Sequence, residues 1–236
     1  MITGRLLGIG VGPGDPELLT LKALRYLQAA PVIAFVSALG QPSIARQIAA
    51  PHLLPGQREI NIALPMHPSP ELAEAAYEEG ASRIGTELER GRDVAVLCEG
   101  DPLMYGSFAH LLSRLVHYPT DIVPGIASIT AAAAAARSPL VGRTDTLAVL
   151  PATLPKEALR ARLDQTDAAA ILKVGRHIEK VRQVLAGLHL LEQAIYVEHV
   201  STPEERVMPL IDLTETTAPY FSLVLIPRRS DRGSDQ

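Results

Sequence analysis

The chain has 236 residues, 47% of them hydrophobic, with a formal net charge of −4 and a pI near 6.0. That length can bury one large core or two cores of about 100 residues each. The slightly acidic balance excludes a broad basic surface, so we expect no nucleic-acid partner. Cys98 is the only cysteine, which excludes an internal disulfide and suits a reducing compartment.

The first residues of the chain and the lengths of its apolar runs indicate where in the cell the protein is expected. Residues 1–5 lack the basic start and long apolar segment of a signal peptide. No apolar run approaches the roughly 18 residues expected of a membrane span. We therefore expect a cytoplasmic protein with no membrane attachment.

The first half of the chain alternates short apolar runs with helical patterns, as α/β domains do. Residues 6–11 predict a first strand, and Asp15 followed by Pro16 predicts a helix that continues to residue 29. Further strands are expected at 32–36, 94–97 and 121–123. Further helices are expected at 43–49, 70–90 and 108–115, and at 131–136 with Ser128 as a cap.

The periodicity changes between residues 138 and 144, where we expect a domain boundary. The second half predicts strands at 147–150, 168–174, 194–200 and 221–226, and helices at 156–163 and 178–186. Thr202 and Glu205 have the spacing of a capping box. The pattern predicts two α/β domains in tandem, 1–138 and 144–229, with mixed strand directions allowed in the second. The polar tail, 230–236, is expected to be disordered.

Three glycine- and proline-rich turns follow predicted strands, at Gly12-Pro13-Gly14, Gly100-Asp101-Pro102 and Pro124-Gly125. Ligands of α/β sheets lie beyond the carboxyl ends of strands, so these turns are the candidate binding walls. None of them contains Lys or Arg, which argues against a phosphate ligand. The carboxylates of Asp15, Glu99 and Asp101 favour a ligand with cationic groups or sugar hydroxyls. S-adenosyl-L-methionine, with an ammonium, a sulfonium and a ribose, satisfies these conditions.

A nicotinamide dinucleotide site is disfavoured by the same turns. The third glycine of G-x-G-x-x-G would fall on Asp15 or on Pro13, and no acidic residue lies between Leu18 and Arg58 to hold a ribose. The seven histidines show no H-E-x-x-H pattern, so we expect no metal site. Cys98 has no nearby histidine and is expected to pack in the core.

Five segments resemble one known family, the tetrapyrrole (corrin and porphyrin) methylases. They are GVGPGDPELLTLKALRYL (10–27), GRDVAVLCEGDPLMYGSF (91–108), VPGIAS (123–128), LKVGRH (172–177) and YVEHVSTPEERVMPL (196–210). CEGDPLMYGS, LPATLPKEALRARL and LKVGRH are most similar to the subgroup that methylates C20 of precorrin-2, giving precorrin-3A in cobalamin synthesis.

The resemblance implies a tetrapyrrole-methylase-like fold of two α/β domains, with S-adenosyl-L-methionine in the cleft between them, and a homodimer. It implies a tetrapyrrole substrate. The positions it assigns to the cofactor are Gly12, Pro13, Gly14, Gly100, Asp101, Met104, Ala127 and Ser128, and, with a less firm alignment, Pro151, Ala152 and His199.

A methyl group on a sulfonium is already activated, so such an enzyme mainly has to position a nucleophilic carbon. A base must then accept the C20 proton, and Asp101, Glu99, Tyr105 and His199 all stay open for that role. For the substrate carboxylates, our hypothesis is Arg137, Arg143, Lys173 and Arg176.

Several alternatives remain beside this interpretation. The substrate could carry cobalt, or the methyl could go to C2/C7, C11 or C17, or to a protein in a diphthamide-type reaction. Outside the family, a dinucleotide-dependent oxidoreductase is opposed by the missing ribose acid. A ligand-sensing module is opposed by the lack of a DNA-binding motif.

Overall fold

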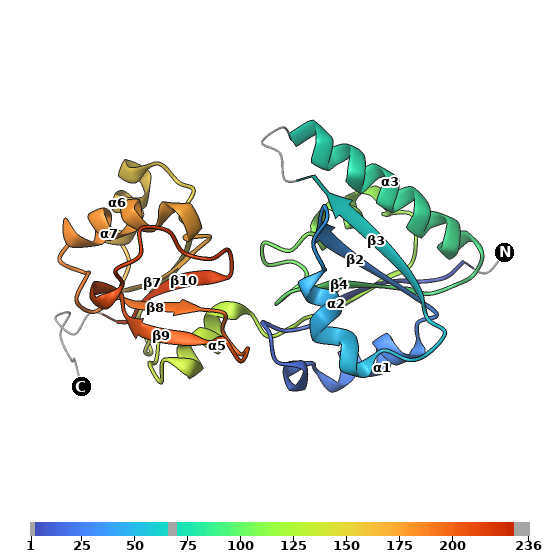
Figure 1. Ribbon diagram of the computed structural model, residues 1–236, viewed down its shortest axis with the longest axis horizontal. Coiled ribbons are helices and arrows are strands. Elements are labelled where there is room, and N and C mark those ends of the chain that lie inside the picture. The colour runs from blue at the N-terminus through green and yellow to red at the C-terminus, as the bar shows by residue number, and fades with distance from the viewer. Residues whose placement is uncertain (1–2, 66–69, 229–236) are drawn as a thin grey trace. The chain divides into compact units, whose positions relative to one another are not determined.

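The computed structural model describes residues 3–65 and 70–228. The chain divides into two compact units, Met1–Ala127 and Ser128–Gln236. Each unit is built on its own five-stranded sheet (Figure 1). The predicted α/β class is confirmed in both units.

The first unit contains a parallel sheet with the strand order β3-β2-β4-β1-β5. Its strands are β1 (Leu6–Gly10), β2 (Val32–Ala38), β3 (Arg58–Leu64), β4 (Val94–Cys98) and β5 (Thr120–Val123). The central strands β1 and β4 are buried along their whole length. Continuous apolar runs are what a parallel sheet covered on both faces requires.

Helices cover both faces of that sheet (Figure 1). They are α1 (Leu21–Ala29), α2 (Ile44–Ala49), α3 (Pro70–Glu89) and α4 (Phe108–Arg114), with 3₁₀ turns η1 (Pro16–Leu18) and η2 (Ala50–His52). Because side chains alternate along a strand, Leu97 packs in the core under α1 and α2, whereas Val96 and Cys98 pack in the core under α3 and α4.

The helix predicted from Pro16 to residue 29 is divided into two. After η1, Leu19 and Thr20 are extended, with ψ angles of 136° and 150°. The Thr20 hydroxyl accepts a hydrogen bond from the Ala23 amide at 3.1 Å and so begins α1 as a new helix. Threonine favours a cap over a helix interior because its side chain competes for backbone hydrogen bonds.

The second unit contains a mixed sheet with the order β6-β7-β10-β8-β9. Its strands are β6 (Leu147–Pro151), β7 (Ala168–Leu172), β8 (Ile195–Glu198), β9 (Arg206–Pro209) and β10 (Ser222–Ile226). Its helices are α5 (Ser128–Ala135), α6 (Lys156–Asp164) and α7 (Ile178–Ala186), with 3₁₀ turns η3 (Gly175–His177) and η4 (Leu210–Asp212). Strands β6 and β7 are parallel, whereas β10 runs antiparallel to both β7 and β8.

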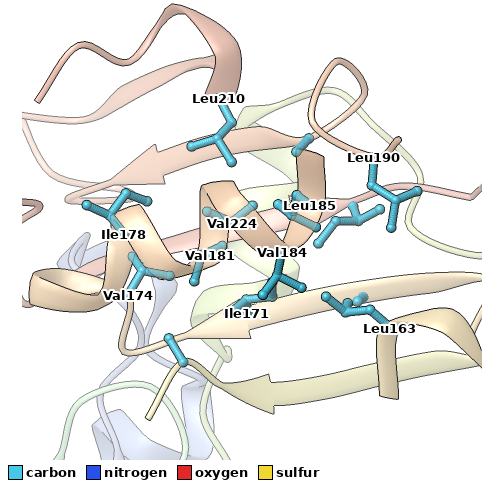
Figure 2. Close-up of a cluster of buried hydrophobic side chains, with 14 of the residues drawn as sticks. Leu163, Ile171, Val174, Ile178, Val181, Val184, Leu185, Leu190, Leu210 and Val224 are labelled. Carbon is cyan, nitrogen blue, oxygen red and sulfur yellow. The ribbon is translucent and has the colours of Figure 1, made fainter. Parts of the chain in front are cut away.

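The core of this unit lies between α7 and the sheet. Val181 and Val184, three residues apart on one face of α7, point toward Ile171 of β7 and Val224 of β10 (Figure 2). That spacing keeps the buried side chains on one stripe of the helix.

The division between the units falls ahead of α5, not behind it at 138–144 as the sequence pattern predicted. Helix α5 packs against β10 and so belongs to the second sheet. The break in periodicity at 138–144 is a loop within the second unit, where the Leu140 carbonyl accepts from the Arg228 amide at 3.2 Å. The predicted disordered tail, 230–236, lies outside the described residues.

Candidate functional site

The turns after β1 and β4 lie at the point of the first sheet where a ligand crevice is expected. From β1 the chain crosses to β2 on one side, and from β4 it crosses to β5 on the other. Strands β1 and β4 are neighbours, so the direction of crossing reverses between them. In open α/β sheets this reversal separates the loops at the carboxyl ends and opens a binding crevice.

The predicted glycine turns are joined there by backbone contacts. The Gly100 amide donates to the Gly12 carbonyl at 2.8 Å, and the Gly12 amide donates back at 3.3 Å. Both glycines have positive φ, +80° at Gly12 and +63° at Gly100, which L side chains rarely adopt. A Cβ added at Gly125 would lie 2.0 Å from the Gly100 carbonyl oxygen. Bare backbone therefore brings the turns after β1, β4 and β5 together.

Asp101 ties two of these turns to each other. Its Oδ1 accepts from the Leu103 amide at 2.9 Å, within its own turn, and its Oδ2 accepts from the Gly125 amide at 3.1 Å. Both carboxylate oxygens are thus engaged with backbone. This arrangement suits an anchoring residue better than a proton acceptor.

Glu99 occupies a different environment, although it is only two residues away. It is partly buried, and its Oε1 accepts a hydrogen bond from the Ala45 amide at 3.2 Å. Burial raises the pKa of this carboxyl, and the hydrogen bonds from the Glu99 and Ala45 amides only partly oppose the shift. A carboxyl with a raised pKa at a strand end is a candidate for proton transfer.

Cys98, at the end of β4, is fully buried, and that burial raises the pKa of its thiol to about 12. It is therefore a neutral thiol that packs under α3 and α4, as the sequence predicted.

The other predicted cofactor positions of the first unit lie on or beside these turns. Pro13 and Gly14 follow Gly12 and are partly exposed, and the Met104 amide donates to the Asp101 carbonyl at 3.4 Å. Tyr105 is 51% exposed and has a φ of 57°. Such backbone strain is frequent at ligand sites. Ala127 is the last residue of this unit, and Ser128 is the first residue of α5 in the next.

In the second unit, three more predicted positions gather at one edge of the sheet. Because β10 is antiparallel to both β7 and β8, the carboxyl ends of β6, β7 and β8 share that edge. Ala152, Lys173 and His199 directly follow those three ends. Lys173 and His199 have positive φ angles of 58° and 49°.

Basic side chains accompany this edge. Lys173 and Arg176 are exposed, and Lys180, which the sequence analysis missed, donates to the Leu154 carbonyl at 2.6 Å. Burial, together with the charges of Lys180 and Arg176, lowers the pKa of His177. The positive charges of Lys173, Arg176 and Lys180 suit a ligand that carries carboxylates.

The two other arginines of the substrate hypothesis are Arg137, which follows α5, and Arg143, which lies ahead of β6. Arg143 precedes the amino end of β6, on the opposite side of the sheet from Lys173. Arg137 follows α5 and has a φ of 50°.

Residues 3–65 and 70–228 were searched for metal-binding groups of side chains and for membrane-spanning helices. No group of three or more His, Cys, Asp or Glu side chains is placed to hold a metal ion there. Across the same residues, every helix is too short or too polar to cross a membrane.

The sequence of this chain is similar to the sequences of known proteins. The chain is 46% identical over 233 residues to the cobalamin biosynthesis protein CobIJ of Mycobacterium tuberculosis, covering 95% of this chain and 46% of that one. The chain thus spans about half the length of that curated relative. It is 40% identical over 238 residues to precorrin-2 C(20)-methyltransferase of a Sinorhizobium species, covering 97% of each chain.

The fold is also found in solved structures. One is the uroporphyrin-III C-methyl transferase of Thermus thermophilus complexed with S-adenosylhomocysteine, with a TM-score of 0.66 and 24% identity over 94% of this chain and 96% of that one. The sequence profile described as Tetrapyrrole (Corrin/Porphyrin) Methylases matches residues 5–213. The chain therefore belongs to the tetrapyrrole methylase family.

Proposed function

We propose that this chain is an S-adenosyl-L-methionine-dependent methyltransferase that adds a methyl group to C20 of precorrin-2, giving precorrin-3A. The observation that carries the proposal is the 40% identity to a precorrin-2 C(20)-methyltransferase over 97% of both chains. That relative is named for precorrin-2 without cobalt, which favours the metal-free substrate over the cobalt form.

The strand-end turns of the first unit fit the proposed cofactor. Gly12, Gly100 and Gly125 have no side chains, so backbone forms much of these turns, and no Lys or Arg lies within them. Backbone carbonyls and carboxylates suit an ammonium, a sulfonium and ribose hydroxyls. We assign Pro13, Gly100, Asp101 and Met104 to this contact, and Asp101 also holds the turns in place.

The cofactor supplies a methyl group on sulfur that is already activated for transfer. C20 of the substrate attacks that methyl, the carbon–sulfur bond breaks, and C20 must then lose its proton. The turn after β4 offers two carboxylates, Glu99 and Asp101, and both oxygens of Asp101 already accept backbone hydrogen bonds. The pKa of Glu99 is raised, and its Oε1 accepts a hydrogen bond from the Ala45 amide, so we assign the proton to Glu99.

A titration separates this proposal from its main rival. The purified chain should bind S-adenosylhomocysteine with a micromolar dissociation constant and show no heat with NAD in isothermal titration calorimetry. Binding of NAD without binding of S-adenosylhomocysteine would favour the dinucleotide-dependent oxidoreductase. Binding of neither would remove the basis for a methyltransferase.

The basic edge of the second unit gives a prediction for the substrate. Arg176→Ala should raise the KM for precorrin-2 about tenfold, because a charge-assisted hydrogen bond contributes about 1.5 kcal/mol or more. The Kd of S-adenosylhomocysteine should not change. Arg162→Ala, an exposed arginine of α6, is the matched control and should leave both values unaltered. A fall in cofactor affinity in Arg176→Ala would contradict the assignment.

The homodimer, the cytoplasmic location and the absence of nucleic-acid or membrane partners stay predictions. So do the roles of Ala127, Ser128, Pro151, Ala152 and His199 at the cofactor, and of Arg137, Arg143 and Lys173 at the substrate.

A further inference from the structure

A second basic site lies in the first unit, at the opposite end of the sheet from the strand-end turns. It is a pocket of about 210 Å³ where the amino end of β3 meets the last turns of α3. Its lining includes Arg58, Glu59, Arg83, Thr86, Glu87 and Arg90. That volume is large enough for several water molecules and therefore for a small polyanion.

One buried carboxylate organises the arginines of this pocket. The side chain of Glu87 is 2% exposed and pairs with Arg58 at 2.9 Å, Arg90 at 3.1 Å and Arg92 at 2.8 Å. Burial would raise the pKa of Glu87, but the hydrogen bond from Arg92 and the charges of Arg58, Arg92 and Arg90 outweigh it and lower the pKa. Glu87 is therefore ionised at neutral pH and holds three guanidinium groups close together.

The charges at the pocket do not balance. Glu59, the other carboxylate of the lining, is already paired with Arg46 at 2.8 Å. Arg83 donates to the Asn61 carbonyl at 2.9 Å, and none of the carboxylates in the described residues forms an ion pair with it. Four guanidinium groups, those of Arg46, Arg58, Arg90 and Arg92, thus share two carboxylates, and Arg83 adds a fifth positive charge that pairs with neither, on a chain whose net charge is −4.

The arginines could instead serve only to stabilise the carboxyl end of α3, where cations are favourable. That role accounts for Arg90 and Arg92, which follow the last turn of the helix. It leaves out Arg58, which comes from β3, and Arg83, which lies more than one turn inside α3.

We propose that this pocket binds a small multivalent oxyanion, with phosphoryl or carboxylate groups, through Arg58, Arg83 and Arg90. Guanidinium forks match both kinds of oxyanion bidentately, and their partial exposure leaves donors free to face a ligand. The site is separate from the strand-end turns and does not depend on the proposed methyltransferase activity.

The test is calorimetric titration of the full chain with pyrophosphate and with citrate at constant ionic strength, using chloride as the compensating salt. We expect saturable binding of at least one probe, and the better probe distinguishes a phosphoryl from a carboxylate ligand. Arg83→Gln should weaken that binding at least tenfold without lowering the Tm, because the Arg83 side chain is exposed and its hydrogen bond to the Asn61 carbonyl lies at the surface. Arg58→Gln should weaken it as well.

Arg25→Gln, an exposed arginine of α1, is the matched control and should bind the probe as the unmodified chain does. The affinity for S-adenosylhomocysteine should be the same with and without the saturating probe. No saturable binding, equal binding by Arg83→Gln and Arg25→Gln, or displacement of S-adenosylhomocysteine by the probe would each overturn the proposal.

Discussion

Gly125→Ala is expected to lower the affinity for S-adenosylhomocysteine at least tenfold and to destabilise the chain by about 3 kcal/mol. The added Cβ would lie 2.0 Å from the Gly100 carbonyl oxygen and 2.8 Å from the Gly10 Cα. Both neighbours are backbone, so relief requires the turns after β1 and β4 to separate. Urea denaturation and calorimetric titration measure the two effects.

Gly56→Ala is the matched control for that substitution. Gly56 has a φ of +89°, but a Cβ there meets nothing within 4 Å. The control therefore imposes backbone strain of about 1 kcal/mol without any overlap, and cofactor affinity should be unchanged. If Gly125→Ala binds S-adenosylhomocysteine as tightly as Gly56→Ala does, the three turns do not form the cofactor site.

Glu99→Gln is expected to lower kcat about 100-fold while making the chain more stable at neutral pH. The amide can still accept the hydrogen bond from Ala45, but it cannot take a proton from C20. Since burial raises the folded-state pKa of Glu99, the folded chain binds more protons than the unfolded chain between the two pKa values. The protonated Glu99 carboxyl therefore contributes to the stability of the fold at low pH, and this contribution is lost as the pH rises through the pKa of Glu99 in the folded chain.

In Glu99→Gln that pH-dependent loss should disappear, so its Tm should exceed that of the unmodified chain above the folded pKa. The acid limb of kcat/KM should also lie at higher pH than for an ordinary glutamate, and it should be absent from the variant. Asp101→Asn is the comparison, because it removes a bond between turns and should lower both stability and cofactor affinity. An unchanged kcat in Glu99→Gln would exclude Glu99 as the proton acceptor.

The sequence predicts the buried strands of this fold well, and it predicts the edge strands β5 and β6 but not the other two. Strands β1 and β4 are continuous apolar runs because both of their faces are covered. The edge strands β3 and β9 were missed. Most residues of β9 are exposed, and β3 buries only Ile60 and Ile62 among polar neighbours. Partial burial leaves only a short alternation, which is difficult to separate from loop sequence.

The capping box predicted at Thr202 and Glu205 was wrong for a local reason. The Thr202 hydroxyl donates to the His199 carbonyl at 2.8 Å, and Glu205 accepts from the Ser201 amide at 2.7 Å. These bonds close a turn between β8 and β9, and no helix follows. The same residue types serve helix caps and turns, so spacing alone does not distinguish them.

At the candidate site, the sequence located the turns but not their contacts. The bond from the Gly125 amide to Asp101 and the bond from Ala45 to Glu99 join residues 24 and 54 positions apart. These two contacts distinguish Asp101, which anchors the turns, from Glu99, which we propose as the proton acceptor. Composition and spacing treat Asp101 and Glu99 alike, since only the folded sheet decides which backbone amides reach them.

The most direct test is to incubate the chain with metal-free precorrin-2 and S-adenosylmethionine labelled with ¹³C in its methyl group, and then to locate the label by NMR. We expect one labelled methyl per tetrapyrrole, on C20, and S-adenosylhomocysteine as the second product. A label on any other carbon, or transfer only to the cobalt-containing substrate, would contradict the proposed function.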